Sequence, residues 1–283
     1  MNILQNIPLK GLTTFKIGGN AKFFCEPKSV EELQEAISFA QKKSLKFYFI
    51  GLGSNLLIND GGIDGLVVKS GLNDFKIEGN RLFVGSGYPL QDLVHISIEA
   101  GLEGLEVLAG IPGSVGGAVV QNAGQKEGTI GEYVQSVEVV DDLGNFKTLS
   151  KSDCEFGYRN TIFKKKKLFI TKIELVLSNG EVESLKAKFR KILKNKLLTQ
   201  PYDFPSAGSF FKNPEGDFAG RLIEAAGLKG LSIGDAEISE KHANFIINRG
   251  KASSKDVLLL AKKISDIILE KFGKKLEAEV VIL

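Results

Sequence analysis

Residues 51–57 read GLGSNLL and directly follow an apolar run, residues 46–50, that predicts a β strand. The stretch begins like the dinucleotide-binding fingerprint, which needs glycine at its first, third and sixth positions. Gly51 and Gly53 satisfy the first two, but Leu56 stands at the sixth. Residues 59–62, NDGG, then predict a turn where a Rossmann unit would place its helix. A Rossmann fold is therefore disfavoured, and the stretch is either another nucleotide-binding loop or a tight turn.

A second glycine-rich stretch, residues 110–118, reads GIPGSVGGA. Glycines allow the main chain to approach phosphate oxygens closely and to point successive N–H groups at them. Ser114 adds a hydroxyl donor, but no lysine follows at the Walker position, which argues against an ATP-binding P-loop. Either loop alone could be a simple turn, whereas two such loops together favour a dinucleotide.

The composition is typical of a globular protein, with 43% hydrophobic and 25% charged residues in a chain of 283. The 37 basic and 34 acidic residues give a net charge of +3, which is too even to indicate nucleic acid or a membrane surface as partner. No signal peptide or membrane-length apolar stretch is visible, so we expect a cytoplasmic protein with Cys25 and Cys154 reduced. His95 and His242 are too few for a histidine-rich metal site, and no metal is expected.

The apolar patterns predict a mixture of strands and helices, and thus an α+β fold. Strands are expected at residues 21–26, 46–50, 66–69, 81–84, 134–141, 146–149, 168–177, 243–248 and 279–283. Helices are expected at residues 89–100, 181–196, 217–226 and 255–272, with another that begins at a capping box formed by Ser29 and Glu32. The lysine-rich helix 181–196 marks the expected domain boundary, with its charges in solvent.

Longer motifs carry a resemblance to a known family. Residues 51–57 resemble the FAD-binding signature of the vanillyl-alcohol-oxidase (PCMH) type of flavoenzymes. Residues 101–124 resemble the second FAD loop of the UDP-N-acetylenolpyruvoylglucosamine reductases. Further motifs similar to that family are FGYRNTIFK at 156–164, PSAGSFFKNP at 205–214, AGRLIEAAGLKG at 219–230, SEKHANF at 239–245 and EV at 279–280. The chain resembles the compact type of the family, which lacks an extra loop with a tyrosine.

The resemblance implies an FAD-binding domain over residues 1–185, with two α+β subdomains of about residues 1–60 and 61–185, rejoined by a C-terminal strand at residues 276–283. A smaller α+β substrate-binding domain is expected over residues 190–275. FAD is expected to bind noncovalently, and NADPH to supply the hydride. The expected FAD-binding residues are Gly51, Gly53, Ser54, Asn55, Leu56, Gly110, Ile111, Pro112, Gly113, Ser114, Gly116, Gly117, Ala118 and Asn122.

In the reaction that the resemblance implies, the enolpyruvyl ether of UDP-N-acetylglucosamine accepts a hydride and then a proton. Arg159 is expected to hold the substrate carboxylate, because a guanidinium is a permanently charged fork. Ser209 is expected to donate the proton, and Glu279 to be either protonated or paired with Arg159. The expected substrate-binding residues are Tyr158, Lys212, Asn213, Arg221 and Lys229.

Two other functions remain open at this point. One is an oxidase of the same flavin fold that is reduced by its own substrate, and the other is a nucleotide-sugar-binding protein without catalysis. The combination of Arg159, Ser209 and Glu279 favours the reductase, because a binding protein needs no acid at a reacting carbon. The serine motif offers no Ser-His-Asp relay, which argues against a hydrolase. We expect a monomer.

Overall fold

The computed structural model describes residues 1–283, which form two compact units. Unit 1 comprises residues 1–5, 23–52 and 64–195, and unit 2 comprises residues 6–22, 53–63 and 196–283. The chain passes from one unit to the other five times: within strands β1 (Leu4–Pro8) and β2 (Asn20–Cys25), between residues 52 and 53, at the start of β5 (Ile63–Lys69) and within helix α4 (Val182–Thr199). The domain boundaries expected from the sequence stay a prediction, because a compact unit need not be a domain that folds alone.

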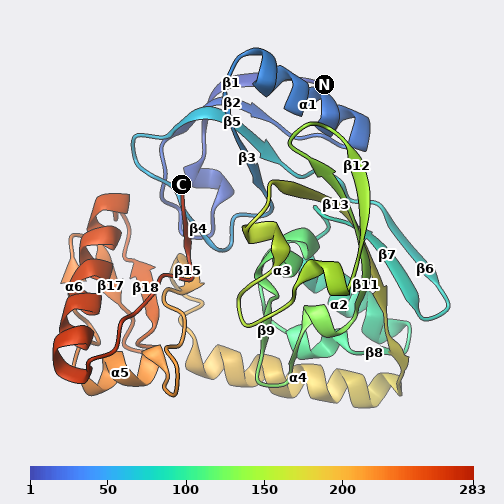
Figure 1. The fold of residues 1–283 in the computed structure, drawn as a ribbon. Helices are drawn as coiled ribbons and strands as arrows, with labels where there is room; N and C mark the ends of the chain where they lie inside the picture. The colour runs from blue at the N-terminus through green and yellow to red at the C-terminus, as the bar shows by residue number, and fades with distance from the viewer. The chain divides into compact units, whose positions relative to one another are not determined.

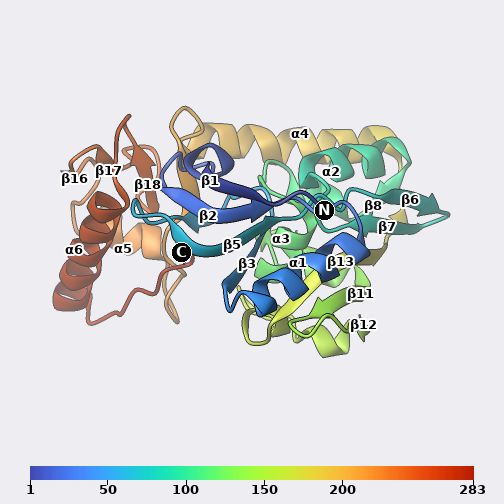
Figure 2. The ribbon, with the colours of Figure 1, turned by 90° about the horizontal axis from the view of Figure 1, so that it is seen from above.

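Helix α1 (Val30–Lys42) packs on a four-stranded sheet with the order β1-β2-β5-β3 (Figure 2). Strands β3 (Lys46–Ile50) and β5 (Ile63–Lys69) run parallel in it. Ser29 caps α1, since its hydroxyl oxygen accepts a hydrogen bond from the Glu32 N–H at 3.3 Å. The Glu32 carboxylate accepts from the N–H of Lys28 at 2.7 Å, one residue before the cap. The expected helix start is therefore confirmed, and the reciprocal bond of the capping box is shifted by one residue.

The second sheet of unit 1 is antiparallel, with the order β12-β11-β13-β7-β6. Its strands are β6 (Phe75–Glu78), β7 (Arg81–Gly85), β11 (Val134–Asp141), β12 (Phe146–Ser150) and β13 (Leu168–Val176). Helices α2 (Leu90–Glu99) and α3 (Val115–Gln121) share its hydrophobic core (Figure 1). Helix α3 and strand β6 were not predicted from the sequence.

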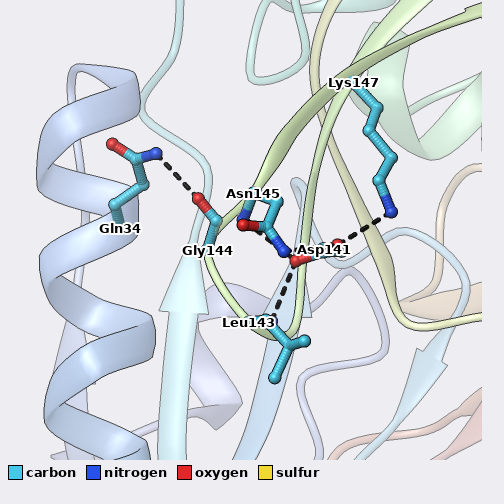
Figure 3. Close-up of polar contacts among 6 residues, drawn as sticks. All are labelled: Gln34, Asp141, Leu143, Gly144, Asn145 and Lys147. Atoms are coloured by element: carbon cyan, nitrogen blue, oxygen red, sulfur yellow. Dashed lines mark hydrogen bonds and ion pairs between the residues drawn. The ribbon is translucent and has the colours of Figure 1, made fainter.

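The turn between β11 and β12 ties this second sheet to α1 (Figure 3). Asp141 Oδ1 accepts hydrogen bonds from the N–H groups of Leu143 and Asn145, and Lys147 Nζ lies 2.9 Å from Asp141 Oδ2. The ion pair with Lys147 and these hydrogen bonds hold the pKa of Asp141 well below its usual range. Gln34 on α1 donates to the carbonyl of Gly144 at 2.8 Å. The predicted hairpin turn therefore also joins two layers of unit 1.

Helix α4 buries Leu185, Phe189 and Ile192 in the core of unit 1, as its amphipathic pattern predicts. Two lysines depart from the expected solvated face, because Lys196 is buried and Lys188 pairs with a buried carboxylate. Lys188 Nζ lies 2.6 Å from the carboxylate of Glu106, which is fully buried. The remaining short elements of unit 1 are β8 (Leu102–Glu103), η2 (Leu105–Leu108), β9 (Gly124–Gln125), β10 (Gly128–Thr129), η3 (Ile130–Glu132), η4 (Ser152–Cys154), η5 (Ile162–Lys164) and β14 (Ser178–Asn179).

Unit 2 is built on an antiparallel sheet with the order β15-β18-β17-β16. Its strands are β15 (Ser206–Ser209), β16 (Ser232–Ile233), β17 (Ala236–Ile238) and β18 (Phe245–Asn248). Helices α5 (Ala219–Ala225) and α6 (Ser254–Phe272) contribute to its core, and Figure 2 shows α6 alongside this sheet. Helix α6 begins at a complete capping box between Ser253 and Asp256 and ends at Gly273, as the sequence predicts.

The last strand, β19 (Val281–Ile282), runs parallel to β4 (Leu56–Leu57) within unit 2. A short 3-10 helix, η1 (Lys10–Leu12), completes this unit. Cys25 and Cys154 are both buried and unbonded, and burial raises their pKa values to about 12 and about 11. None of the helices has the length and the apolar character needed to span a membrane.

Candidate functional site

The two glycine-rich stretches meet within unit 1. Gly51 follows β3, and a Cβ atom placed on it would lie 2.2 Å from Ser114 Oγ. No side chain fits at such a distance, so glycine at position 51 allows the two loops to lie against each other. The structure therefore brings together the beginning of the first predicted loop and the centre of the second.

Gln91 on α2 holds the loop that precedes Ser114. Its side-chain amide donates to the carbonyls of Leu108 and Ile111 at 3.0 and 2.9 Å, and its oxygen accepts from the N–H of Gly110 at 2.8 Å. Gly113 has a φ of 122°, a backbone conformation that favours glycine. Gln91 was missed by the sequence analysis, because a glutamine within an amphipathic helix carries no sign of such contacts.

Residues 115–121, expected as part of a loop, form helix α3 instead, and Ser114 is its N-cap. Ser114 Oγ accepts a hydrogen bond from the N–H of Gly117 at 3.2 Å. The hydroxyl hydrogen of Ser114 is not used in that bond, so its expected role as a donor to FAD stays a prediction.

Adjacent glycines in the first turn of α3 have different surroundings. A Cβ atom on Gly116 would lie 2.7 Å from the Cβ of Ser86, so this glycine is required by packing within the protein. Gly117 is exposed, and a Cβ there would meet only Ser114 Oγ, at 3.3 Å. A side chain at position 117 would therefore press on the Ser114 hydroxyl and meet no other protein atom within 4 Å. An exposed glycine beside a loop fits the close approach of a phosphate group, as FAD binding requires.

At the other end of α3, main-chain carbonyls hold Arg159. Its guanidinium donates to the carbonyls of Asn122 and Gly124 at 3.4 and 3.1 Å, where the helix dipole also favours a cation. Asn122 has a left-handed conformation, and its side chain donates to the carbonyl of Gly157 and accepts from the N–H of Gly131. The expected contact of Asn122 with FAD stays a prediction.

Arg159 lies in a tight turn closed by a hydrogen bond from the N–H of Gly157 to the carbonyl of Asn160 at 3.0 Å. Arg159 has a φ of 50°, and its guanidinium lies 5.5 Å from the centre of the Tyr158 ring. Tyr158 is 58% exposed. The turn therefore combines a fixed cation with an aromatic side chain that solvent can reach.

In unit 2, Ser209 is the last residue of β15, and the next residue is hydrogen-bonded to the C-terminal segment. The N–H of Glu279 donates to the carbonyl of Phe210 at 2.8 Å. Asn55 donates from its side chain to the carbonyl of Glu279 at 3.1 Å. Three residues expected at the site from separate motifs, Asn55, Ser209 and Glu279, are therefore connected through Phe210.

Residues 53–57 belong to unit 2, although they continue the loop that begins at Gly51. Gly53 has a φ of 70°, and a Cβ on it would lie 2.0 Å from the carbonyl oxygen of Leu12. Ser54 is half-buried, and Leu56 is paired with Val281. Gly53 is therefore required by close packing within unit 2, and its expected contact with FAD stays a prediction.

Most of the side chains expected to bind substrate make contacts within unit 2. Lys212 Nζ lies 3.4 Å from Glu277, and Lys229 Nζ lies 2.5 Å from Glu224. Arg221 pairs with Asp217, and this ion pair lowers the pKa of Asp217 to about 2. Asn213 accepts a hydrogen bond from the N–H of Ala219 at the start of α5. The substrate-binding roles of these residues stay predictions.

Asn244, in the motif at residues 239–245, was given no role by the sequence analysis. It is buried and makes hydrogen bonds with the main chain of Phe210 and Phe211, next to Ser209. His242 Nδ1 accepts from the N–H of Asn244 at 3.3 Å, and burial lowers the pKa of this histidine. The motif indicated the segment, but not which side chain contacts the serine strand.

Two families match separate parts of this chain. Residues 21–150 match the family described as an FAD binding domain. Residues 200–283 match the family described as UDP-N-acetylenolpyruvoylglucosamine reductase, C-terminal domain.

Curated proteins named UDP-N-acetylenolpyruvoylglucosamine reductase are similar to the chain over its full length. One from Clostridium botulinum is 42% identical over 283 residues, covering 100% of this chain and 92% of the relative. One from Clostridium tetani is 40% identical with the same coverage. The sequence resemblance is therefore confirmed along the whole chain.

Solved structures agree with the sequence relatives. The crystal structure of UDP-N-acetylenolpyruvylglucosamine reductase from Thermus caldophilus matches with a TM-score of 0.86 and 36% identity, covering 99% of this chain and 98% of that one. Cholesterol oxidase from Brevibacterium sterolicum matches over 63% of this chain with a TM-score of 0.50 and 15% identity, which shows a likeness of fold alone. The expected fold, α+β with an FAD-binding domain of the vanillyl-alcohol-oxidase type, is confirmed. This chain belongs to the family of UDP-N-acetylenolpyruvoylglucosamine reductases.

Proposed function

We propose that this protein reduces the enolpyruvyl ether of UDP-N-acetylglucosamine to UDP-N-acetylmuramate, with NADPH as reductant and FAD as bound cofactor, in the synthesis of peptidoglycan precursors. The 42% identity to a reductase of this name over the full chain supports the reaction. The observation of this structure that carries the proposal is the hydrogen bond between Glu279 and Phe210, the residue after Ser209. This main-chain bond pairs the segment that carries the expected proton donor with the segment that carries the expected carboxyl group.

FAD, when bound, takes a hydride from NADPH and delivers it to the substrate. The residues of unit 1 fit this cofactor, because the loops at Gly51 and Ser114 meet and Gly117 leaves space beside them. Main-chain N–H groups of these loops would face the pyrophosphate. The cofactor contacts of the other residues in both loops are part of the same proposal.

Arg159 would stabilise the substrate carboxylate during the reduction. Hydride addition to the terminal alkene carbon moves an electron pair onto the neighbouring carbon and its carboxylate, which then carries two negative charges. A guanidinium fixed by the carbonyls of Asn122 and Gly124 is already oriented when this charge develops. Tyr158, exposed beside it, would contact the substrate.

Ser209 would donate its hydroxyl proton to the carbon that carries the new electron pair, which completes the reduction. The strongly basic carbon makes a hydroxyl group a sufficient acid. Glu279, in its protonated form, would donate a hydrogen bond to the same intermediate, whereas an ionised carboxylate would repel it. Lys212, Asn213, Arg221 and Lys229 would bind the UDP-sugar portion, and the acidic partners of Lys212, Arg221 and Lys229 would then exchange for phosphate.

The protein would act as a monomer in the cytoplasm, where its nucleotide substrates are made. The nearly even balance of 37 basic and 34 acidic residues supports a small-molecule substrate held by local charges.

Anaerobic absorbance spectroscopy of the purified flavoprotein tests the proposal. NADPH is added first, and UDP-N-acetylglucosamine enolpyruvate second. We expect the flavin absorbance near the visible maximum to bleach with NADPH and to return in proportion to the enolpyruvyl compound added.

Each other outcome contradicts a defined part of the proposal. A flavin that bleaches but is not reoxidised by the enolpyruvyl compound would support FAD as the cofactor and exclude that compound as the substrate. A flavin that NADPH does not reduce would favour an oxidase reduced by its own substrate. A protein that binds no FAD after reconstitution would exclude flavin chemistry altogether.

A further inference from the structure

Asn244 is 4% exposed and lies directly before strand β18 in unit 2. Its side-chain oxygen accepts a hydrogen bond from the N–H of Phe211 at 3.0 Å, and its side-chain amide donates to the carbonyl of Phe211 at 2.8 Å. Its own main-chain carbonyl accepts from the N–H of Phe210 at 2.7 Å. Asn244 therefore makes three hydrogen bonds to the two residues that follow Ser209.

These hydrogen bonds lie directly after the point where the strand pairing of β15 ends. Ser209 is paired with Phe245 across the sheet, and the register between β15 and β18 shifts before this point. A side-chain amide has one carbonyl acceptor and an N–H donor, as a main-chain amide has. The Asn244 side chain therefore satisfies both main-chain groups of Phe211, which would be costly to leave unpaired in the interior.

The opposite edge of the same segment is paired with the C-terminal residues. The N–H of Glu279 donates to the carbonyl of Phe210, and the N–H of Lys212 donates to the carbonyl of Glu277, both at 2.8 Å. The segment 210–212 is thus held between Asn244 on one edge and residues 277–279 on the other. Any shift of Phe211 away from Asn244 would move Ser209 and Glu279 relative to each other.

We propose that Asn244 is a positioning residue, which fixes Ser209 against Glu279 for proton donation to the substrate. This inference rests on the proposed function. Asn244 need not touch the substrate, because its side chain is buried and both of its polar ends are used by Phe211.

The substitution Asn244→Asp changes one atom of the side chain and tests the inference. An ionised aspartate still accepts from the N–H of Phe211, but its second oxygen faces the Phe211 carbonyl and repels it. We expect reoxidation of the reduced flavin by the enolpyruvyl substrate to slow about tenfold or more, since small misplacements of reacting groups cost this much. Flavin reduction by NADPH should stay within about twofold of the wild type.

Asn248→Asp is the matched control. Asn248, the last residue of β18, is another buried asparagine, 2% exposed, whose amide donates to the carbonyl of Phe15 at 3.2 Å. Its oxygen accepts from the N–H groups of Gly250 and Ala252. The same one-atom change therefore removes one donated hydrogen bond in the same unit, away from Ser209. It should lower the melting temperature and leave the ratio of the two half-reaction rates unchanged.

Stopped-flow absorbance measures both half-reactions separately in the FAD-loaded wild type and variants. If Asn244→Asp does not accumulate as a folded flavoprotein, Asn244→Ala replaces it, and we expect the same selective loss of reoxidation. The inference is overturned if both half-reactions slow equally, if neither changes, or if Asn248→Asp slows reoxidation as much. A wild-type flavin that the enolpyruvyl compound does not reoxidise would instead refute the proposed function.

Discussion

Gly117 offers a test in which protein stability and cofactor affinity should change in opposite directions. Gly117 lies in the first turn of α3, and a methyl group placed on it would meet only Ser114 Oγ, at 3.3 Å. Alanine favours a helix over glycine by about 0.5–1 kcal/mol. We therefore expect Gly117→Ala to leave the free energy of unfolding of the FAD-free protein unchanged, or to raise it by up to about 1 kcal/mol.

The same methyl group would occupy the space proposed for the cofactor. Inserting one methyl group into a closely packed contact costs about 1–3 kcal/mol. If that cost falls on the complex alone, the dissociation constant of FAD rises by a factor of about 5 to 150. The size of the change reports how closely a phosphate group approaches this turn.

The neighbouring glycine supplies the control. A methyl group on Gly116 would lie 2.7 Å from Ser86 Cβ and 2.8 Å from the Ser86 carbonyl oxygen, inside the packed core of unit 1. Gly116→Ala should therefore destabilise the FAD-free protein by about 1–3 kcal/mol, which Gly117→Ala should not. The two variants differ only in which of two adjacent residues carries the same methyl group.

Thermal unfolding of the FAD-free proteins and titration of FAD, followed by quenching of its fluorescence, measure the two quantities. Unchanged FAD affinity in Gly117→Ala would refute the placement of the cofactor beside this turn. A loss of stability in Gly117→Ala equal to that in Gly116→Ala would show that the contact with Ser114 Oγ cannot relax and would refute the distinction between the two positions.

Three further predictions concern the proposed proton donor, the proposed carboxylate-binding cation and a half-buried histidine. Ser209→Ala should leave flavin reduction by NADPH nearly intact and strongly slow reoxidation by the enolpyruvyl substrate; equal losses in both half-reactions, measured by stopped-flow absorbance, would contradict its role. Arg159→Lys keeps the charge but loses the fork that contacts Asn122 and Gly124, so reoxidation should slow about tenfold or more, and an unchanged rate would exclude bidentate binding. Burial lowers the pKa of His242, so the unfolded chain binds a proton more readily than the folded one, and stability should fall as the pH drops below about 6.5. His242→Gln should flatten this fall in urea unfolding between pH 7 and pH 5.5, and parallel curves for variant and wild type would show that another group is responsible.

Elements with strong local signals were predictable from the sequence. Strand β3 begins and ends where its apolar run does, and helix α6 is bounded by the capping box at Ser253 and by Gly273. Both signals are local, since a cap or an apolar run is complete within a few residues. The roles of Arg159, Ser209 and Glu279, which the family motifs indicate, stay predictions.

Helix α3 could not be predicted in the same way, because its stability comes from tertiary packing. Gly116 and Gly117 lower its intrinsic helix propensity by about 1 kcal/mol each relative to alanine. The helix forms because Ser114 caps it and because Val115, Ala118 and Val119 are buried in the core of unit 1. The core residues against which Val115, Ala118 and Val119 pack come mostly from other segments, so the glycine-rich stretch alone predicts a loop.

The hydrogen bonds of Asn244 could not be predicted from the sequence for a related reason. Its partners Phe210 and Phe211 are more than thirty residues away, and no pattern in a single sequence links a buried asparagine to a particular main-chain group. Gln91, about twenty residues from Ile111 and Gly110, is a similar case. Both are polar side chains whose use depends on the pairing of distant segments.

Helix α3 connects the two parts of the proposed site in unit 1, which are the turn at Ser114 and the guanidinium of Arg159. Its first turn follows Ser114 and carries Gly117, and the carbonyls at its far end bind the guanidinium of Arg159. A helix of this length spans about 10 Å, so the cofactor loop and the carboxylate-binding cation are held apart by one short rigid element. Thr161, fully buried, adds a hydrogen bond to the carbonyl of Val120 at 2.8 Å, next to the contacts of Arg159. In the proposed site, the two glycines of this helix would serve different needs: Gly116 allows the helix to pack against Ser86, and Gly117 would admit the cofactor at a fixed distance from Arg159.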